Sequence, residues 1–141
     1  IGVLSPLGNT LEETWNGLIN GVSGSDFITL FDAAKFKTRF ACELKGFDPT
    51  NFLEKKEARK LDRFTQTAII ASDQAVIDAG ISDNNVNPDR VGVIFASGIG
   101  GLITFQEEVV NFANGGGTPR FNPFFIPKMI AVIHPKKIQK P

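Results

Sequence analysis

The stretch Arg90–Met129, RVGVIFASGIGGLITFQEEVVNFANGGGTPRFNPFFIPKM, says most about the fold of this 141-residue chain. Its apolar run from Val91 to Ala96 is typical of a strand buried on both faces, so we predict a central parallel strand there. Apolar residues then recur at helical spacing from Leu102 to Phe112, and glycines 115–117 end the predicted helix. Prolines at 119, 123 and 127 are expected to keep the next segment from forming a helix before residue 128.

Two further helices are predicted upstream of this stretch. Thr10 and Glu13 have the spacing of a capping box, which predicts a short amphipathic helix from about Thr10 to Asn20. Residues 28–44 lack a clear period and are expected to be extended or irregular. A stripe of small and apolar residues from Ala58 to Ala79 predicts one long helix, starting near residue 54 and ended by Gly80. Its alanines predict close packing against another element.

Composition excludes several classes of function. The formal net charge is zero and the pI is about 6.8, so no global field holds the chain to nucleic acid or an anionic membrane. No apolar run reaches the length of a bilayer span. Cys42 is the only cysteine, which excludes an internal disulfide and any CxxC metal or redox motif. A reducing, cytoplasmic setting fits this cysteine usage.

Four cations are predicted to lie along one face of the long helix, because their spacing is i, i+3, i+4 and i+7: Lys56, Arg59, Lys60 and Arg63. Cations near a helix N-terminus oppose its macrodipole, which costs a few tenths of a kcal/mol each. From charge alone, the favoured interpretation is a solvated face that Glu57 and Asp62 partly neutralise.

The turn Ser97–Gly101 has glycines before a predicted helix, an arrangement that can hold a phosphate. Its spacing argues against a dinucleotide site, because GxGxxG starting at Gly98 requires glycine where the chain has Ile103. No GK[ST] motif of a P-loop is present either. A tight turn that lets strand and helix pack closely is the plainer interpretation.

The Arg90–Met129 stretch, together with the basic segment EKKEARKLDRFTQ at Glu54–Gln66, resembles the N-terminal part of the β-ketoacyl-acyl carrier protein synthases. Within these condensing enzymes it is most similar to the synthase II type. The resemblance runs from Ile1 to about Ala131, whereas VIHPKKIQKP at 132–141 departs from it. We therefore expect a partial N-terminal ketosynthase domain at 1–131, followed by a tail at 132–141. Both ends are interpreted as truncated, the tail as a truncation or frame-change product.

The resemblance implies an α/β fold of the thiolase-like kind, with layers α/β/α/β/α, of which this chain would be an incomplete N-terminal half. It implies a 3-oxoacyl-[acyl-carrier-protein] synthase. Such an enzyme transfers an acyl group from carrier protein to its cysteine. It then decarboxylates malonyl carrier protein with help from two histidines, and the resulting carbanion attacks the thioester. The implied partners are acyl carrier protein with acyl and malonyl thioesters and a second subunit in a homodimer. No cofactor, metal, nucleic acid or membrane is implied.

The resemblance also assigns site residues. Carrier-protein docking falls to Lys56, Arg59, Lys60 and Arg120, and lining of the acyl pocket to Ile99 and Phe125. Phe124 is expected to be a plain core residue.

No catalytic residue is assigned in this chain. Nothing around Cys42 activates a thiolate, and the adjacent Glu43 carboxylate disfavours one. Cys42 is thus expected to be a buried or half-buried structural residue. His134 lies in the tail, outside the resemblance, so the chain alone is expected to be inactive.

Two alternatives remain open. A polyketide-type ketosynthase, or its non-catalytic chain-length partner, shares the fold. A module that only binds carrier protein would use the same basic residues without turnover.

Overall fold

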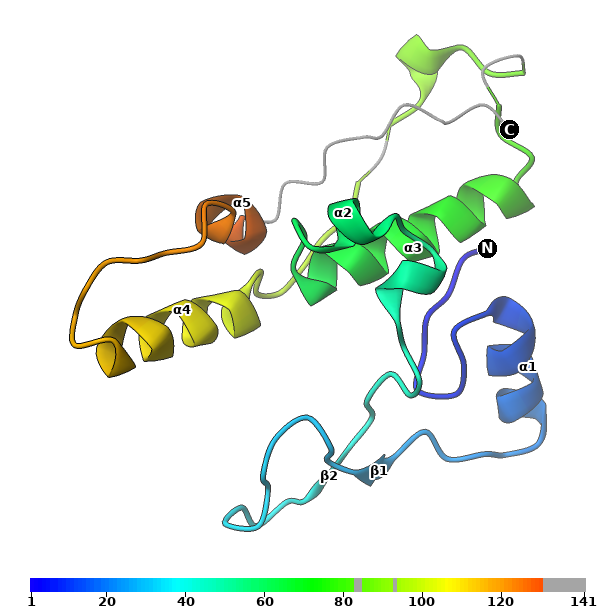
Figure 1. Ribbon diagram of the computed structural model, residues 1–141. Helices are drawn as coiled ribbons and strands as arrows, with labels where there is room; N and C mark the ends of the chain where they lie inside the picture. The colour runs from blue at the N-terminus through cyan, green and yellow to red at the C-terminus, as the bar shows by residue number, and fades with distance from the viewer. Residues whose placement is uncertain (83–84, 93, 131–141) are drawn as a thin grey trace. The chain divides into compact units, whose positions relative to one another are not determined.

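The computed structural model describes residues 1–82, 85–92 and 94–130, which belong to two compact units (Figure 1). The first unit comprises residues 1–48 and 71–79. The second comprises residues 49–70 and those from 80 onward. Helix α3, Arg63–Asp78, contributes its first half to the second unit and its second half to the first. No helix in these described ranges is long and apolar enough to cross a membrane.

The first unit begins with the predicted capped helix, α1, Leu11–Ile19. The Thr10 hydroxyl accepts a hydrogen bond from the Glu13 N–H at 3.2 Å. The Glu13 carboxylate reaches back to the Asn9 N–H at 2.7 Å, one residue before the cap. The predicted start of this helix is confirmed, because the Thr10 side chain satisfies the Glu13 N–H, a backbone donor that the helix itself leaves unpaired.

The second half of α3 packs closely against the N-terminal segment, as its alanines predicted. A Cβ atom on Gly2 would lie 1.8 Å from the Ala71 carbonyl oxygen, so only glycine fits there. The Gln74 side chain holds the same segment at two points. It accepts from the Val3 N–H at 2.9 Å and donates to the Asn9 carbonyl at 3.0 Å. Gly80, with φ of +61°, follows the helix in the left-handed conformation that the sequence predicted.

A small hairpin occupies the predicted irregular region. Strand β1, Asp26–Phe27, pairs antiparallel with β2, Phe40–Ala41. The Phe27 N–H lowers the pKa of the Asp26 carboxyl, with Lys45 as a second cause. Cys42 follows β2 and is exposed, so its expected burial was wrong. The physical reason is that two paired residues per strand form a narrow ribbon with open faces.

In the second unit, the predicted long helix is divided in two. Four residues separate the end of the short helix α2, Lys55–Ala58, from the start of α3. Asp62 causes the division. Its carboxylate accepts from the Phe64 N–H at 3.3 Å, and its carbonyl accepts the first α3 bond, from the Gln66 N–H at 3.0 Å. An aspartate that caps a new helix cannot also continue the preceding one.

Helix α4, Leu102–Asn114, confirms the predicted helix, and Gly116 and Gly117 follow it with positive φ. Helix α5, Phe125–Met129, begins earlier than expected. Pro127 is its third residue, where the missing N–H has no partner within a helix, so proline does not prevent this turn. Short 3₁₀ helices lie at Pro49–Asn51 and Pro88–Arg90.

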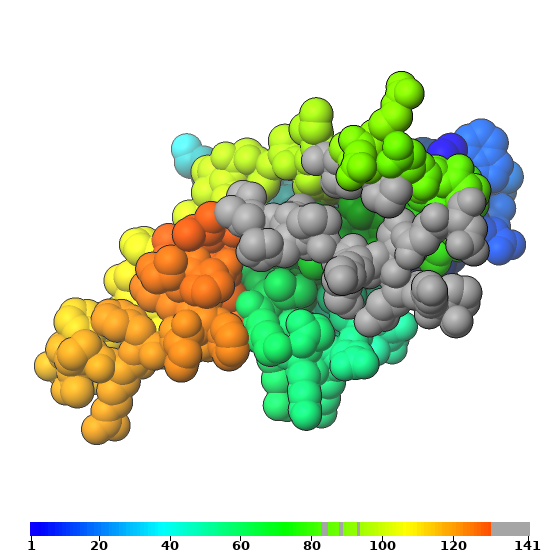
Figure 2. Space-filling model, turned by 90° about the horizontal axis from the view of Figure 1, so that it is seen from above, coloured from blue at the N-terminus to red at the C-terminus, as the bar shows by residue number. Residues whose placement is uncertain are grey.

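Helices α4 and α5 pack through a glycine. A Cβ atom on Gly101, the residue before α4, would lie 2.7 Å from the Lys128 carbonyl oxygen and 2.8 Å from the Met129 Cα. The turn at residues 97–101 therefore serves close packing, as predicted, but against α5 rather than against a strand. Figure 2 shows α5 and the preceding loop, in orange, as one surface with the yellow α4.

The predicted central strand at Val91–Ala96 was wrong for its described residues, 91–92 and 94–96, which have no strand structure. Val93 lies outside the described residues. Ile94 is 98% exposed and Phe95 49%. A parallel strand exists only through hydrogen-bonded neighbours, and the ladder found in the described ranges is the β1–β2 hairpin.

A buried carboxylate joins the starts of α3 and α4. Asp62 is 6% exposed, as is Thr104. Besides capping α3, Asp62 accepts from the Thr104 N–H at 3.3 Å and from its hydroxyl at 2.5 Å. Gly101, at the N-cap position of α4, has no side chain to do this, so Asp62 caps α4 from a distance.

We predict that Asp62→Ala loosens both helix starts, because it leaves the buried Thr104 donors unpaired. Hydrogen bonds to a charged group contribute about 1.5–3 kcal/mol each. Amide hydrogen exchange at Phe64 and Thr104 should become about tenfold faster or more. Asp73→Ala, on the exposed face of α3, is the control and should leave both rates unchanged. Equal rates in the two variants would contradict the assigned role.

Gly101→Ala is predicted to push α5 away from α4, at a cost of about 1–3 kcal/mol. The measurement is amide exchange at Lys128 and Ile130, whose N–H groups donate to the carbonyls of Phe124 and Ile126. Gly98→Ala is the matched control, since nothing lies within 4 Å of a Cβ atom there. If both variants exchange like the parent chain, the close approach at Gly101 is not required.

Candidate functional site

All residues predicted to form a site belong to the second unit: Lys56, Arg59, Lys60, Ile99, Arg120 and Phe125. They come from three places within it. The basic residues of 56–60 lie on and just after α2, Ile99 lies in the turn before α4, and the other two lie in or after the loop between α4 and α5.

Lys56, Arg59 and Lys60 are exposed to solvent. They do not continue into a single four-cation face with Arg63, as the long helix predicted. Helix α2 ends at Ala58, and Arg63 is a half-buried residue at the start of α3. The four cations do not share one helix face because the helix is interrupted between Ala58 and Arg63, where Asp62 caps α3.

The break also alters the electrostatics of this basic segment. The sequence predicted cations at the N-terminus of a long helix, where they oppose the macrodipole. Helix α2 is a single turn of four residues, with Lys56 as the second, so the macrodipole of a long helix does not act on this cation. Lys60 is paired with Glu57, with Nζ and Oε1 2.7 Å apart. The N-terminus of α3 has the Asp62 carboxylate, of the sign that this position favours.

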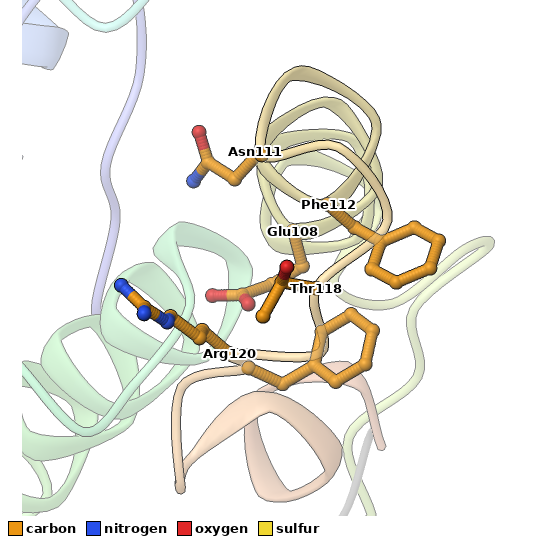
Figure 3. Close-up of a pocket in the computed structure, with 7 residues that line it drawn as sticks. Glu108, Asn111, Phe112, Thr118 and Arg120 are labelled. Carbon is orange, nitrogen blue, oxygen red and sulfur yellow. The ribbon is translucent and has the colours of Figure 1, made fainter.

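Arg120 lies in the loop between α4 and α5, beside a hollow of about 260 Å³. Glu108, Asn111, Phe112, Thr118 and Phe121 contribute to its lining. Figure 3 shows the Arg120 and Glu108 side chains extending to one side of this hollow and the Phe112 ring to the other. The Glu108 carboxylate accepts from the Asn122 N–H at 3.1 Å, which anchors the loop to α4. Arg120 itself is exposed.

The two predicted acyl-pocket residues differ in burial. Ile99 is 68% exposed, and its carbonyl accepts from the Ser97 hydroxyl at 3.0 Å. Phe125 is half-buried as the first residue of α5. Neither lines the hollow beside Arg120. Phe124, expected in the core, is 40% exposed, because α5 directs Phe125 rather than Phe124 toward α4.

Four phenylalanine rings form a stack that sequence reasoning missed. Phe125 stacks on Phe105 of α4 at 6.5 Å between ring centroids and on Phe121 at 5.6 Å. Phe121 in turn stacks on Phe112 of α4 at 5.6 Å. The available signal was spacing: the α4 rings are seven residues apart, which is two turns on one face, and the others are four apart. The stack places Phe125 between the loop and α4.

Asp62 and Thr104 were also missed as a pair. The sequence assigned Asp62 only to neutralising nearby cations. Their separation of 42 residues hides the contact from any local pattern. The one usable signal was an aspartate followed by residues that favour a helix, which predicts an N-cap.

The described residues offer no catalytic constellation. Cys42 is exposed in the hairpin region of the first unit. His134 lies outside the described residues. Within the ranges that the structure covers, no group of three His, Cys, Asp or Glu side chains could hold a metal ion. The described part of the site is therefore a charged and apolar surface.

Comparison with known proteins identifies the family. The model of the β-ketoacyl synthase N-terminal domain matches residues 1–134. The chain is 44% identical over 131 residues to 3-oxoacyl-[acyl-carrier-protein] synthase 2 of Synechocystis sp., covering 93% of this chain and 31% of that protein. The enzyme of the same name from Staphylococcus aureus is 43% identical over 130 residues, with 92% and 31% covered. The chain thus spans about a third of the length of these relatives.

Solved structures support the same assignment. The ishigamide ketosynthase/chain length factor superposes with a TM-score of 0.78 at 28% identity, covering 92% of this chain and 32% of that one. A complex of a type II PKS acyl-carrier protein with its ketosynthase superposes with a TM-score of 0.65 at 22% identity. The match covers 92% of this chain and 33% of that one, and it shows likeness of fold. The resemblance found in the sequence is confirmed: the chain belongs to the β-ketoacyl synthases, within their N-terminal domain.

Proposed function

We propose that this chain forms part of a 3-oxoacyl-[acyl-carrier-protein] synthase, a cytoplasmic homodimer that elongates fatty acids. The 44% identity over 131 residues with the Synechocystis synthase 2 carries this proposal. The proposed whole has the thiolase-like α/β/α/β/α fold, with residues 1–131 in its first half and 132–141 as a tail. The likeness to ketosynthase structures supports this layering, of which the described residues contain helices and one two-stranded sheet.

The proposed reaction is a decarboxylative Claisen condensation. An enzyme thiolate takes the acyl group from carrier protein and releases the carrier thiol. Malonyl carrier protein then loses carbon dioxide, and the electron pair of the broken bond attacks the acyl thioester, which frees the enzyme thiolate and forms the 3-oxoacyl carrier protein. Stabilising the developing thioester enolate is electrostatic catalysis. The contribution proposed for this chain is to bind carrier protein and acyl chain.

Carrier-protein docking is proposed for Lys56, Arg59, Lys60 and Arg120. All four side chains are exposed. The formal net charge of the whole chain is zero, so an acidic partner is recognised by local positive charge rather than by a global field. Complementary charge of this kind steers encounter and weakens as salt is added.

Lining of the acyl pocket is proposed for Ile99 and Phe125. Ile99 presents an apolar side chain that is 68% exposed, and the ring stack fixes Phe125 on α4. A flexible acyl chain needs such a surface, because each buried methylene contributes about 0.8 kcal/mol. These two residues would determine how the acyl chain is bound, without taking part in bond making.

A second candidate is a polyketide-type ketosynthase or its chain-length partner. The TM-score of 0.78 with the ishigamide ketosynthase/chain length factor favours it. Its identity of 28% is lower than the 44% shared with the fatty acid synthase, which is why the first proposal stands ahead. A module that only binds carrier protein would share the docking surface with both.

Docking is tested by binding of the chain to fluorescently labelled acyl carrier protein, followed by anisotropy. We expect binding that weakens with salt and falls about fivefold or more in Lys60→Glu. Lys37→Glu, an exposed lysine of the first unit, is the charge-matched control and should bind normally. Equal loss in both variants, or binding that salt does not affect, would sink the docking proposal.

Condensing chemistry by the isolated chain is predicted to be absent, because none of its described residues forms an activated thiolate or a histidine pair. The measurement is release of labelled carbon dioxide from malonyl carrier protein, with a full-length synthase assayed beside it. Release no greater than the protein-free rate is expected. Decarboxylation above that rate would show that catalytic groups have been overlooked.

A further inference from the structure

Glu57 is the single acidic residue of the segment Lys55–Lys60, whose sequence is KKEARK. Its Oε1 atom lies 2.7 Å from Lys60 Nζ, one turn along the chain. The two side chains are 41% and 44% exposed, so solvent and any partner can reach both. The carboxylate therefore occupies one face of a cation assigned to docking.

An acidic partner that approaches Lys60 finds its ammonium group already paired with the Glu57 carboxylate. A carboxylate of the partner must either displace Glu57 from the ammonium group or share it, which places two anions close together. Exposed pairs of this kind are weak, so the partner can displace Glu57, but the exchange reduces the gain on binding. Lys56 and Arg59 beside this pair are also exposed.

We propose that Glu57 is a built-in competitor for Lys60, which lowers the affinity of the docking surface for an acidic carrier protein. The inference rests on the proposed docking function. Its use lies in the order of the reaction: an acyl carrier must leave before a malonyl carrier can dock on the same surface. A competitor within the chain replaces the departing anion at Lys60 and speeds that exchange, since affinity differences between related complexes lie mostly in dissociation.

The opposite role has a different signature. Glu57 could instead hold the Lys60 side chain in the conformation that binds the partner. Removing Glu57 would then weaken binding, because the Lys60 side chain would have to be ordered when the complex forms. A general increase in positive charge is a third explanation for tighter binding. It would not depend on Lys60.

The experiment measures binding of holo acyl carrier protein at low ionic strength to the full chain and to Glu57→Gln, Lys60→Gln and the double variant. Glutamine keeps the length and helix preference of glutamate, so α2 is little disturbed. We expect Glu57→Gln to bind about two- to threefold tighter than the parent chain, with a correspondingly slower dissociation of the carrier protein. In the Lys60→Gln background, the same change should give no gain.

Glu12→Gln, exposed on α1 in the first unit, carries the same change in net charge and should leave affinity unchanged. Unchanged or weaker binding by Glu57→Gln overturns the inference while salt-sensitive binding by the parent chain upholds docking. A gain that persists without Lys60, or that Glu12→Gln reproduces, assigns the effect to net charge and also overturns it. Absence of binding by the parent chain overturns docking and the competitor role together.

Discussion

One buried carboxylate organises the second unit. Asp62 caps α3 through Phe64 and holds Thr104 in the first turn of α4 by two hydrogen bonds. Both helices direct the positive ends of their dipoles toward it, which favours an anion at that point. Because Gly101 must be small to meet α5, α4 cannot supply its own cap. The end of the basic segment, the glycine turn and the seat of α5 therefore depend on the same side chain.

The sequence predicted those elements whose causes are local. The Thr10 cap, the glycines that end α4 and the left-handed Gly80 each depend on a few neighbouring residues. The long helix from residue 54 and the strand at 91–96 were wrong for the opposite reason. Asp62 gains its capping role partly from a residue 42 positions away, and a buried strand requires neighbours that no local pattern supplies.

The candidate site likewise has features that the sequence predicted and features that depend on contacts between distant residues. Its residue types came from resemblance to a family, and the structure places them on or just after α2, in the turn before α4, and in the loop and first residue of α5. What sequence could not give is how they are held: the Lys60–Glu57 pair depends on the end of α2, and the loop at Arg120 on Glu108 of a neighbouring helix. After α4 the chain turns back, so that Phe121 packs on Phe112 of that helix. The periodicity of residues along one helix cannot reveal such a contact.

The ring stack has a mechanical consequence. Arg120 precedes Phe121 directly, and Phe121 stacks on both Phe112 and Phe125. Movement of the arginine backbone therefore acts on a ring that contacts two others, and stacked rings slide only by losing contact with their neighbours. Displacing Arg120 would therefore disturb the contacts of Phe121 with both rings, which couples the loop mechanically to Phe125 at the start of α5.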